Sequence, residues 1–423
     1  MMRSHTDVLV VGSGVAGLYC ALNLPASKQV TVITKAKAEQ SDSFLAQGGI
    51  CVLRDEGDYE AFFEDTMRAG HRCNDPRSVE IMIRSSRRVI TDLVARGVRF
   101  ERDGDGLAYT REGAHSAPRI LYHQDETGKE ITSCLLEAVS RKPNIRLVED
   151  FAMVDLLCSG NVCHGVVGFG EGLGEWAVEA DYTVLATGGV GGLFERSTNY
   201  AHLTGDAIAL GMRHGVKMRD LDYVQIHPTT LYTPEQGRAF LISESVRGEG
   251  GVLLGANGER FVDELLPRDA VTAAIRAQME LEGTPHVWLS LAAIPRDDIM
   301  GHFPHIYRHC LERGYDVTRE PIPVVPAQHY FMGGIAVDHC GATSMERLYA
   351  AGETACNGVH GKNRLASNSL LESLVFAQRA AWSIARGYSS AGTRQAVSAH
   401  APALDAASLE AIREAVGARS SSR

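Results

Sequence analysis

The first 35 positions divide into apolar and polar segments in the order of a strand, a helix and a second strand. Residues 8–11 form a short, uninterrupted apolar run, which is typical of a strand buried in a parallel sheet. An apolar helical segment continues to Leu24 and ends at Pro25, because proline cannot continue a helix. Residues 29–34 predict the next strand. Together these segments predict a βαβ unit.

The turn between the first strand and the helix carries a glycine pattern. Gly12, Gly14 and Gly17 fit G-x-G-x-x-G, a spacing that permits a tight turn and the close approach of a pyrophosphate to the start of the helix. The unit therefore predicts a dinucleotide site. Lys35 follows the second strand, at the place where an acidic residue would bind ribose hydroxyls in an NAD site, so this position disfavours NAD.

Further along, the apolar periodicity predicts two helices and a series of strands. These elements are expected at 59–70, 78–96, 145–148, 153–157 and 163–167. Residues 181–189 then predict an apolar strand that runs into Ala-Thr-Gly-Gly, where the small residues Thr187 and Gly188 let the backbone approach a ligand closely. Paired with the glycine turn, this second turn predicts FAD in an α/β, Rossmann-like fold.

A change in composition divides the chain into domains. Between 221 and 330, prolines and polar motifs separate short helices, and afterwards the earlier pattern returns. A strand is expected at 348–353 and a helix at 365–385. We therefore expect an FAD-binding domain made of residues 1–220 and 331–390, with an α+β capping domain inserted at 221–330.

Composition excludes several classes of partner. The 423 residues include 42 Lys and Arg against 52 Asp and Glu, a net charge of −10, whereas a nucleic-acid footprint needs a basic face. No apolar run approaches the roughly 18 residues of a membrane span, so we expect no membrane contact and a cytoplasmic location. The nine cysteines form no C-x-x-C pair, and we expect neither a metal site nor an iron–sulfur cluster.

Five stretches combine histidine or arginine with glycine, proline or hydroxyl residues, as functional loops often do. Each alone has a plain alternative, such as a capped turn or a surface ion pair. Five of them beside a dinucleotide fingerprint favour a functional site. They are TREGAHS (110–116), QIHPTTLY (225–232), SESVRGEGG (243–251), LPRDAV (266–271), and HYFMGG with HGKNRLASNSL (329–334 and 360–370).

These stretches, together with GSGVAGL, AQGG, ATGG and AGE, resemble the succinate dehydrogenase/fumarate reductase flavoprotein family. The match runs in order over 6–390, and within the family the nearest likeness is to the aspartate oxidases. The resemblance implies FAD-dependent oxidation of L-aspartate to iminoaspartate by hydride transfer to flavin N5, the first step of quinolinate and NAD synthesis. It also implies oxygen or fumarate as electron acceptor and transient contact with a quinolinate synthase.

The resemblance also implies which residues act on the substrate, whose two carboxylates need cationic and imidazole donors. Arg268 matches the family's proton donor or acceptor. An arginine needs help in that role because its pKa lies above ~12, and a flanking carboxylate such as Glu244 or Asp269 is expected to provide it. Catalytic roles are implied for Arg268, Glu112, His227, His329 and Arg364. Substrate contacts are implied for Glu112, His227, Ser243, Glu244, Arg247, His329, Arg364 and Ser367.

A second implied set holds FAD. Respiratory members of the family attach FAD covalently through a histidine before T-x-x-A-[QE]-G-G, whereas this chain has Asp42 and Ser43 there, so we expect non-covalent FAD. The implied FAD residues are Gly12, Ser13, Gly14, Val15, Ala16, Gly17, Lys35, Asp42, Ser43, Phe44, Leu45, Ala46, Gln47, Gly48, Gly49, Thr187, Gly188, Asp206, Glu353, Ser369 and Leu370.

Glu112 is the residue expected to distinguish aspartate from dicarboxylates that have no amino group. A carboxylate would repel fumarate or succinate, whereas it would attract the ammonium group of aspartate. The resemblance favours such a substrate contact. The alternative is that Glu112 pairs with Arg111 or Arg119 on a solvated loop, where an ion pair contributes little.

Two other functions stay open from the sequence. One is a soluble fumarate reductase or a related flavin dehydrogenase, which the role of Glu112 would distinguish. The other is a non-catalytic flavoprotein or regulatory fragment, because the family's C-terminal helical domain is largely absent. Residues 391–423 are rich in alanine and serine with one helical run at 408–417, and we interpret them as a tail that is the start of that domain.

Overall fold

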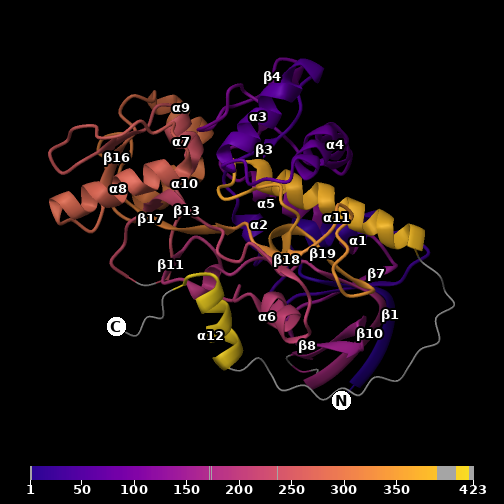
Figure 1. Cartoon of the computed structure of the whole chain (residues 1–423). Helices are drawn as coiled ribbons and strands as arrows, with labels where there is room; N and C mark the ends of the chain where they lie inside the picture. The colour runs from indigo at the N-terminus through magenta and orange to yellow at the C-terminus, as the bar shows by residue number, and fades with distance from the viewer. Residues whose placement is uncertain (1, 171, 173, 236, 388–405, 419–423) are drawn as a thin grey trace.

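The computed structural model describes residues 2–170, 172, 174–235, 237–387 and 406–418. Its largest sheet has the strand order β7-β2-β1-β10-β9-β8, and β19 pairs with β10 outside that path (Figure 1). Strands β7, β2, β1, β10 and β19 run parallel, and β9 and β8 continue the sheet antiparallel. The strands are β1 (Met2–Val11), β2 (Val30–Ile33), β7 (Ile145–Val148), β8 (Phe151–Ser159), β9 (Val162–Gly170), β10 (Gly174–Leu185) and β19 (Leu348–Ala350).

Helices cover the parallel part of this sheet. In Figure 1, α11 crosses the molecule beside α1, and the two helices make extensive contact. The start of α4 is set by its local sequence. Asp75 accepts hydrogen bonds from the amides of Arg77 and Ser78, and Pro76 occupies the first turn, where a proline is tolerated. The helices of this part are α1 (Val15–Asn23), α2 (Asp42–Leu45), α3 (Tyr59–Ala69), α4 (Pro76–Ala95), α5 (Thr127–Ser140), α6 (Asp206–Arg213) and α11 (Asn368–Gly387).

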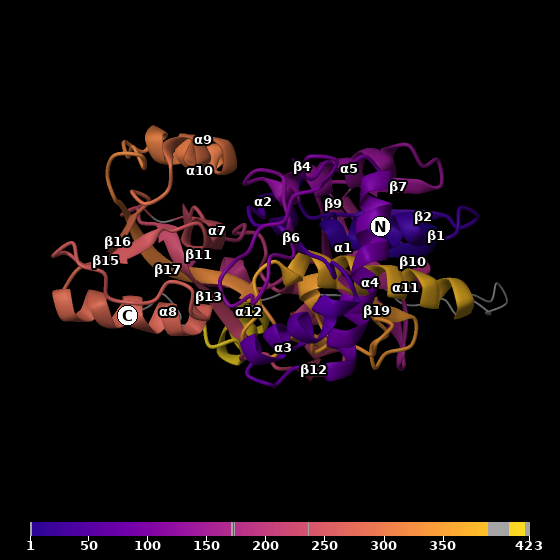
Figure 2. The ribbon, with the colours of Figure 1, turned by 90° about the horizontal axis from the view of Figure 1, so that it is seen from above.

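A second sheet forms the other part of the molecule. Its order is β14-β11-β17-β16-β15, with β13 antiparallel to β17. Figure 2 shows α8 on one side of this sheet and α9 and α10 on the other. The elements are β11 (Arg196–Ser197), β13 (Val224–Leu231), β14 (Gly237–Arg238), α7 (Glu244–Gly248), β15 (Val252–Leu254), α8 (Arg268–Glu282), β16 (Val287–Ser290), α9 (Arg296–His302), α10 (Pro304–Glu312) and β17 (Ile322–Phe331).

Short strands complete the described fold. β3 pairs with β6, β4 with β5, and β18 lies between β12 and β20. Their bounds are β3 (Ile50–Cys51), β4 (Arg102–Asp103), β5 (Gly106–Leu107), β6 (Ile120–Leu121), β12 (Met218–Arg219), β18 (Gly334–Ala336) and β20 (Ala355–Cys356).

Most elements predicted from periodicity are confirmed, and several predicted boundaries are wrong. β1 starts at Met2, well before residue 8, because it pairs with β10 from Met2 onward, and β19 ends at Ala350 instead of residue 353. β10 starts at Gly174, well before residue 181, because it pairs with β9 over that length, and it ends at Leu185. The Ala-Thr-Gly-Gly segment is therefore irregular backbone. The helix expected at 365–385 starts at Asn368, because Ser367 has a positive φ of 61° that cannot belong to a right-handed helix.

The fold class is the expected one, a Rossmann-like sheet with an added α+β part. The boundaries at 220 and 330 stay predictions, and we note that the second sheet also includes β11. α12 (Ala406–Ala415) matches the helical run expected at 408–417, and its fully buried Ile412 packs beside α6. The other tail positions, 391–405 and 419–423, lie outside the described residues. Within the described chain, no helix is both long enough and apolar enough to span a membrane.

Candidate active site

A continuous pocket extends from the carboxyl ends of β1 and β10 to the second sheet. Its lining includes the glycine turn after β1 at one end and side chains from β13, β17 and α8 at the other. Ligands of open α/β sheets bind at such strand ends, where the connections diverge. The pocket thus joins the two sequence regions in which a cofactor and a substrate were expected.

The glycine turn packs closely against neighbouring backbone only because side chains are missing. A Cβ atom on Gly12 would lie 1.9 Å from the Ala186 carbonyl oxygen, and one on Gly17 would lie 2.0 Å from the Gly12 oxygen. Gly12 also has a φ of +119°, which favours glycine. Gly14 caps α1 without a side-chain hydrogen bond. The first amides of this helix therefore suit an anionic group such as the FAD pyrophosphate.

Polar side chains surround this end of the pocket. Lys35 Nζ lies 2.8 Å from Asp206 Oδ2, so the two residues expected to contact FAD also pair with each other. Burial raises the pKa of Asp42 to about 7, although the Tyr200 amide donates to this carboxyl. Burial and the charge of Asp42 raise the pKa of Glu353 to about 8. Near neutral pH both acids therefore populate protonated forms, which can donate hydrogen bonds to a cofactor.

Nearly every implied FAD residue lines the pocket, which supports the fit of the cofactor. Val15 and Gly17 do not line it. Val15 packs in the core while its amide donates to Ser43 Oγ at 3.2 Å, and Gly17 packs against the backbone of Gly12. The implied FAD residues that line the pocket are Gly12, Ser13, Gly14, Ala16, Lys35, Asp42, Ser43, Phe44, Leu45, Ala46, Gln47, Gly48, Gly49, Thr187, Gly188, Asp206, Glu353, Ser369 and Leu370.

At the other end, two histidines and two arginines converge from four chain segments. His227 lies on β13 and His329 on the neighbouring β17, and their ring centroids are 5.1 Å apart. Arg268 is the first residue of α8, and Arg364 precedes α11. Antiparallel pairing of β13 with β17 thus brings together two histidines that lie about a hundred positions apart in sequence.

Burial controls the charge of these groups. Burial and the nearby Arg268 guanidinium lower the pKa of both His227 and His329 well below its usual value, so both imidazoles are neutral near pH 7. Burial lowers the pKa of Arg364 to about 10, which still leaves it charged. His227 Nε2 and Arg364 Nε are buried without a hydrogen-bond partner in the described structure. Such unpaired groups are suited to binding a ligand.

Arg268 belongs to a chain of buried charges. Its Nε donates to Glu244 Oε2 at 2.5 Å, and Arg247 NH2 lies 3.4 Å from the same carboxyl oxygen. Burial opposes ionisation of Glu244, but Arg268 and Arg247 outweigh it and hold the pKa of this carboxyl below its ordinary value. Glu244 is therefore ionised beside Arg268, as expected for the helping carboxylate. Asp269, the other candidate for that role, instead contacts His71 and Asn363.

Glu112 is buried and faces this pocket, with only 3 % of its surface exposed. Its Oε1 accepts a hydrogen bond from Ser245 Oγ at 2.8 Å, and its Oε2 accepts one from Ser367 Oγ at 2.6 Å. Burial and the charge of Glu244 raise the pKa of Glu112. The alternative of a solvated ion pair with an arginine of the same loop is therefore wrong, whereas contact with a substrate stays a prediction.

One implied substrate residue lies elsewhere, and one important residue was missed. Arg247 does not line the pocket, because its NH1 donates to the Glu264 carbonyl oxygen and its charge faces Glu244. Gln225 was not among the predicted residues, yet it accepts from Arg268 NH1 at 2.9 Å and donates to the Arg364 carbonyl oxygen at 2.8 Å. Its position two residues before His227 in a conspicuous motif was the available signal.

Comparisons with known proteins agree with this geometry. Residues 7–370 match the family model described as an FAD binding domain. The chain is 50 % identical over 384 residues to an L-aspartate oxidase of Clostridium perfringens, covering 90 % of this chain and 87 % of that protein. It is 49 % identical to an L-aspartate oxidase of Clostridium acetobutylicum over 385 residues, covering 90 % of this chain and 88 % of that protein.

Solved structures show the same fold. A quinol–fumarate reductase with menaquinol molecules superposes with a TM-score of 0.88 at 30 % identity, covering 99 % of this chain and 75 % of that one. A flavocytochrome c3 fumarate reductase in an open conformation has a TM-score of 0.71 at 26 % identity, covering 90 % and 78 % of the two chains.

Proposed function

Because the chain belongs to the FAD-binding flavoprotein family that includes the L-aspartate oxidases, we propose that it oxidises L-aspartate to iminoaspartate. This reaction removes a hydride from the substrate carbon and a proton from its ammonium group. FAD, when bound, supplies the hydride acceptor at its N5 atom. The product would enter quinolinate and NAD synthesis. We further propose that FAD is held non-covalently, since Asp42 and Ser43 occupy the segment where a covalent histidine would stand.

The converging basic groups are suited to hold the two carboxylates of the substrate. Arg364 supplies a permanent charge, and the neutral imidazoles of His227 and His329 supply directional hydrogen bonds without adding further charge. Ser243 adds a hydroxyl group from the pocket wall, whereas the Ser367 hydroxyl donates to Glu112 Oε2. Binding both carboxylates at fixed points orients the carbon between them.

Arg268 is the proposed proton acceptor. It lines the pocket, and its Nε donates a hydrogen bond to the ionised Glu244. A charged guanidinium can accept a proton only after it loses one, so the Nε proton would pass to Glu244 as the guanidine takes the proton from the substrate. Arg247 extends the same buried charge chain behind Glu244. Gln225 fixes the other side of the guanidinium, so Arg268 is held in one orientation.

The burial of Glu112 in this pocket is the single observation that most directly supports L-aspartate as the substrate. Glu112 places a buried carboxylate in a pocket whose other groups suit two carboxylates, and a dicarboxylate without an amine would be repelled by it. The ammonium group of aspartate would instead be attracted. Ser245 and Ser367 hold the carboxylate by both oxygens, which orients it without neutralising it.

The reaction is tested by mixing the purified flavoprotein anaerobically with L-aspartate, D-aspartate and succinate. L-Aspartate alone should bleach the flavin absorbance, with one iminoaspartate formed for each flavin reduced. Bleaching by succinate but not by L-aspartate would overturn the proposal. Denaturation in acid should release all the FAD into the supernatant, whereas a covalent flavin would remain with the protein.

A fumarate reductase is the second candidate, because solved fumarate reductases share the fold at 26–30 % identity. Reduction of fumarate by the dye-reduced enzyme, at a rate far above that of aspartate oxidation, would favour it. The acceptor for aspartate oxidation is proposed to be oxygen or fumarate, and a quinolinate synthase is a proposed transient partner. The cytoplasm is the proposed location.

A further inference from the structure

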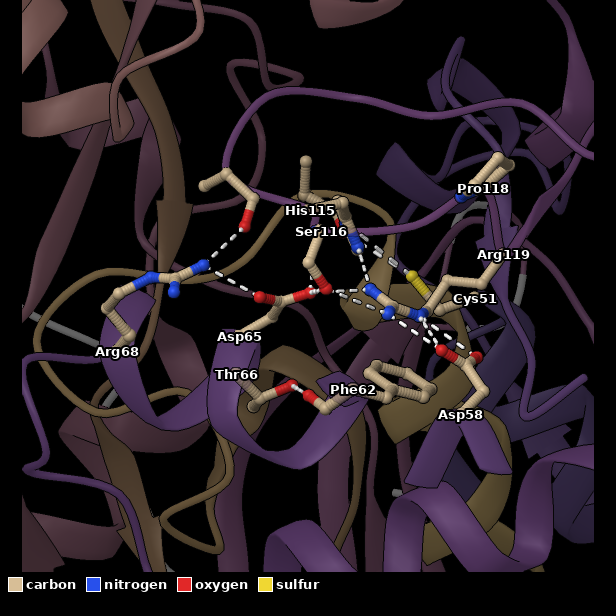
Figure 3. A network of polar contacts seen from close by, with 12 residues as sticks. Cys51, Asp58, Phe62, Asp65, Thr66, Arg68, His115, Ser116, Pro118 and Arg119 are labelled. Carbon is tan, nitrogen blue, oxygen red and sulfur yellow. Dashed lines mark hydrogen bonds and ion pairs between the residues drawn. The ribbon is translucent and has the colours of Figure 1, made fainter. Parts of the chain in front are cut away.

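A buried ion network lies behind the loop that carries Glu112. Arg119 has no exposed surface, and its guanidinium lies between Asp58 and Asp65 (Figure 3). NH2 is 2.9 Å from Asp58 Oδ1, and NH1 is 2.7 Å from Asp65 Oδ2. Ser116 donates to the same Asp65 oxygen from both its amide and its hydroxyl. These contacts fix the 110–120 loop to α3.

His115 connects this network to a second segment. Arg119 NH1 is 3.0 Å from His115 Nδ1, and His115 Nε2 is 3.1 Å from the Ala366 carbonyl oxygen. Arginine can only donate, so Nδ1 must accept, and the proton of the neutral ring must lie on Nε2 and point at Ala366. Burial and the charge of Arg119 lower the pKa of His115 to about 4, which keeps this single tautomer through the neutral range.

The Ala366 carbonyl precedes the residue that holds Glu112. Ser367 has a φ of +61°, a left-handed conformation that costs a non-glycine residue free energy unless its surroundings enforce it. From this conformation its hydroxyl donates to Glu112 Oε2 at 2.6 Å. The Cys51 amide also donates to the Ser367 carbonyl oxygen at 3.0 Å. The turn is therefore held on both sides of its strained residue.

We propose that His115 is a positioning residue for the substrate-selecting carboxylate. By donating to the Ala366 carbonyl oxygen, it holds the left-handed Ser367 turn, and that turn aims the Ser367 hydroxyl at Glu112. The inference rests on the proposed function, because it assigns His115 to the step in which Glu112 meets the substrate ammonium group. His115 itself does not line the pocket.

Three variants separate this role from a general structural one. His115→Asn keeps an acceptor for Arg119 but is too short to reach Ala366, and His115→Gln can replace the donor to Ala366. Ser116→Ala is the matched control, because Ser116 lies in the same loop and network but has no described contact with Ala366. Flavin content and thermal unfolding verify that each variant is folded.

The measurements are kcat/KM for L-aspartate oxidation and for fumarate reduction, each in the natural and the Glu112→Gln background. His115→Asn should lower kcat/KM for aspartate about tenfold, the effect of one net hydrogen bond, and leave fumarate reduction within about twofold. In the Glu112→Gln background the same change should have no further effect. His115→Gln should recover most of the loss, and Ser116→Ala should show none of this selectivity.

The two hypotheses fail in different ways. If Glu112→Gln lowers aspartate oxidation and fumarate reduction equally, the role of Glu112 in the proposed function is wrong. If Glu112→Gln is selective but His115→Asn weakens both reactions alike, or acts equally in the Glu112→Gln background, then His115 has only a structural role and the inference is overturned.

Discussion

Replacement of Glu112 by glutamine is the most direct test of how this pocket distinguishes an amino acid from its deaminated analogue. The substitution keeps the size of the side chain and lets its oxygen accept from Ser245 or Ser367, while it removes the negative charge. Because Glu112 is buried, its charge acts on a bound ammonium group with little screening by water.

The size of the effect follows from that environment. A hydrogen bond that involves a charged group contributes about 1.5–3 kcal/mol, so kcat/KM for L-aspartate should fall about 10- to 150-fold. Reduction of fumarate should stay constant or rise, since the dicarboxylate loses a repulsive neighbour. Burial raises the pKa of Glu112, so aspartate oxidation should fall as the pH drops through that raised pKa, and this limb should disappear in the variant.

Stopped-flow flavin reduction by L-aspartate and dye-coupled reduction of fumarate measure the two activities on the same preparation. Glu249→Gln is the matched control. Glu249 forms a hydrogen bond with His302 in the part of the molecule that contains the second sheet, and it does not line the pocket. Equal losses in the two reactions for Glu112→Gln, or a similar selective loss in the control, would refute the charge argument.

Three further predictions concern stability. Arg119→Met should cost about 3–5 kcal/mol of unfolding free energy in urea titrations, because it removes the buried cation that lies between Asp58 and Asp65. Arg99→Met should cost under about 1 kcal/mol, because the Arg99 side chain is exposed, and similar costs for the two variants would contradict this. Burial raises the pKa of Glu372 to about 7, so ionisation of this carboxyl weakens the fold as pH rises from about 4 to above 7. Glu372→Gln should therefore raise the melting temperature at pH 8 and change it little at pH 4. Equal shifts in melting temperature at the two pH values would contradict this prediction. Asp125→Ala should lower stability by about 1 kcal/mol, since its carboxylate caps the start of α10 from the FAD-binding part, and an unchanged melting temperature would exclude that role.

Much of the cofactor site followed from local sequence. The spacing of Gly12, Gly14 and Gly17 between an apolar run and a helix depends on backbone geometry within a few residues, and it correctly predicted the turn at the end of β1. The helix expected at 78–96 was predictable in the same way because its apolar stripe is local, although it starts at Pro76, where Asp75 caps it. The start of β10 was not, since its first half is stabilised by pairing with β9 and not by its own periodicity.

The chemical environment of the charged residues was decided by the tertiary structure alone. The sequence placed Glu112 beside Arg111 and close to Arg119, where an ion pair within the loop was a reasonable alternative. In the fold, Arg119 is paired with Asp58 and Asp65, and Glu112 receives hydroxyl groups from Ser245 and Ser367, more than 130 and 250 positions away. The local sequence pattern determines which backbone conformations are possible. The burial and the charge state of a side chain depend on every segment that packs around it, and distant segments meet only in the folded chain.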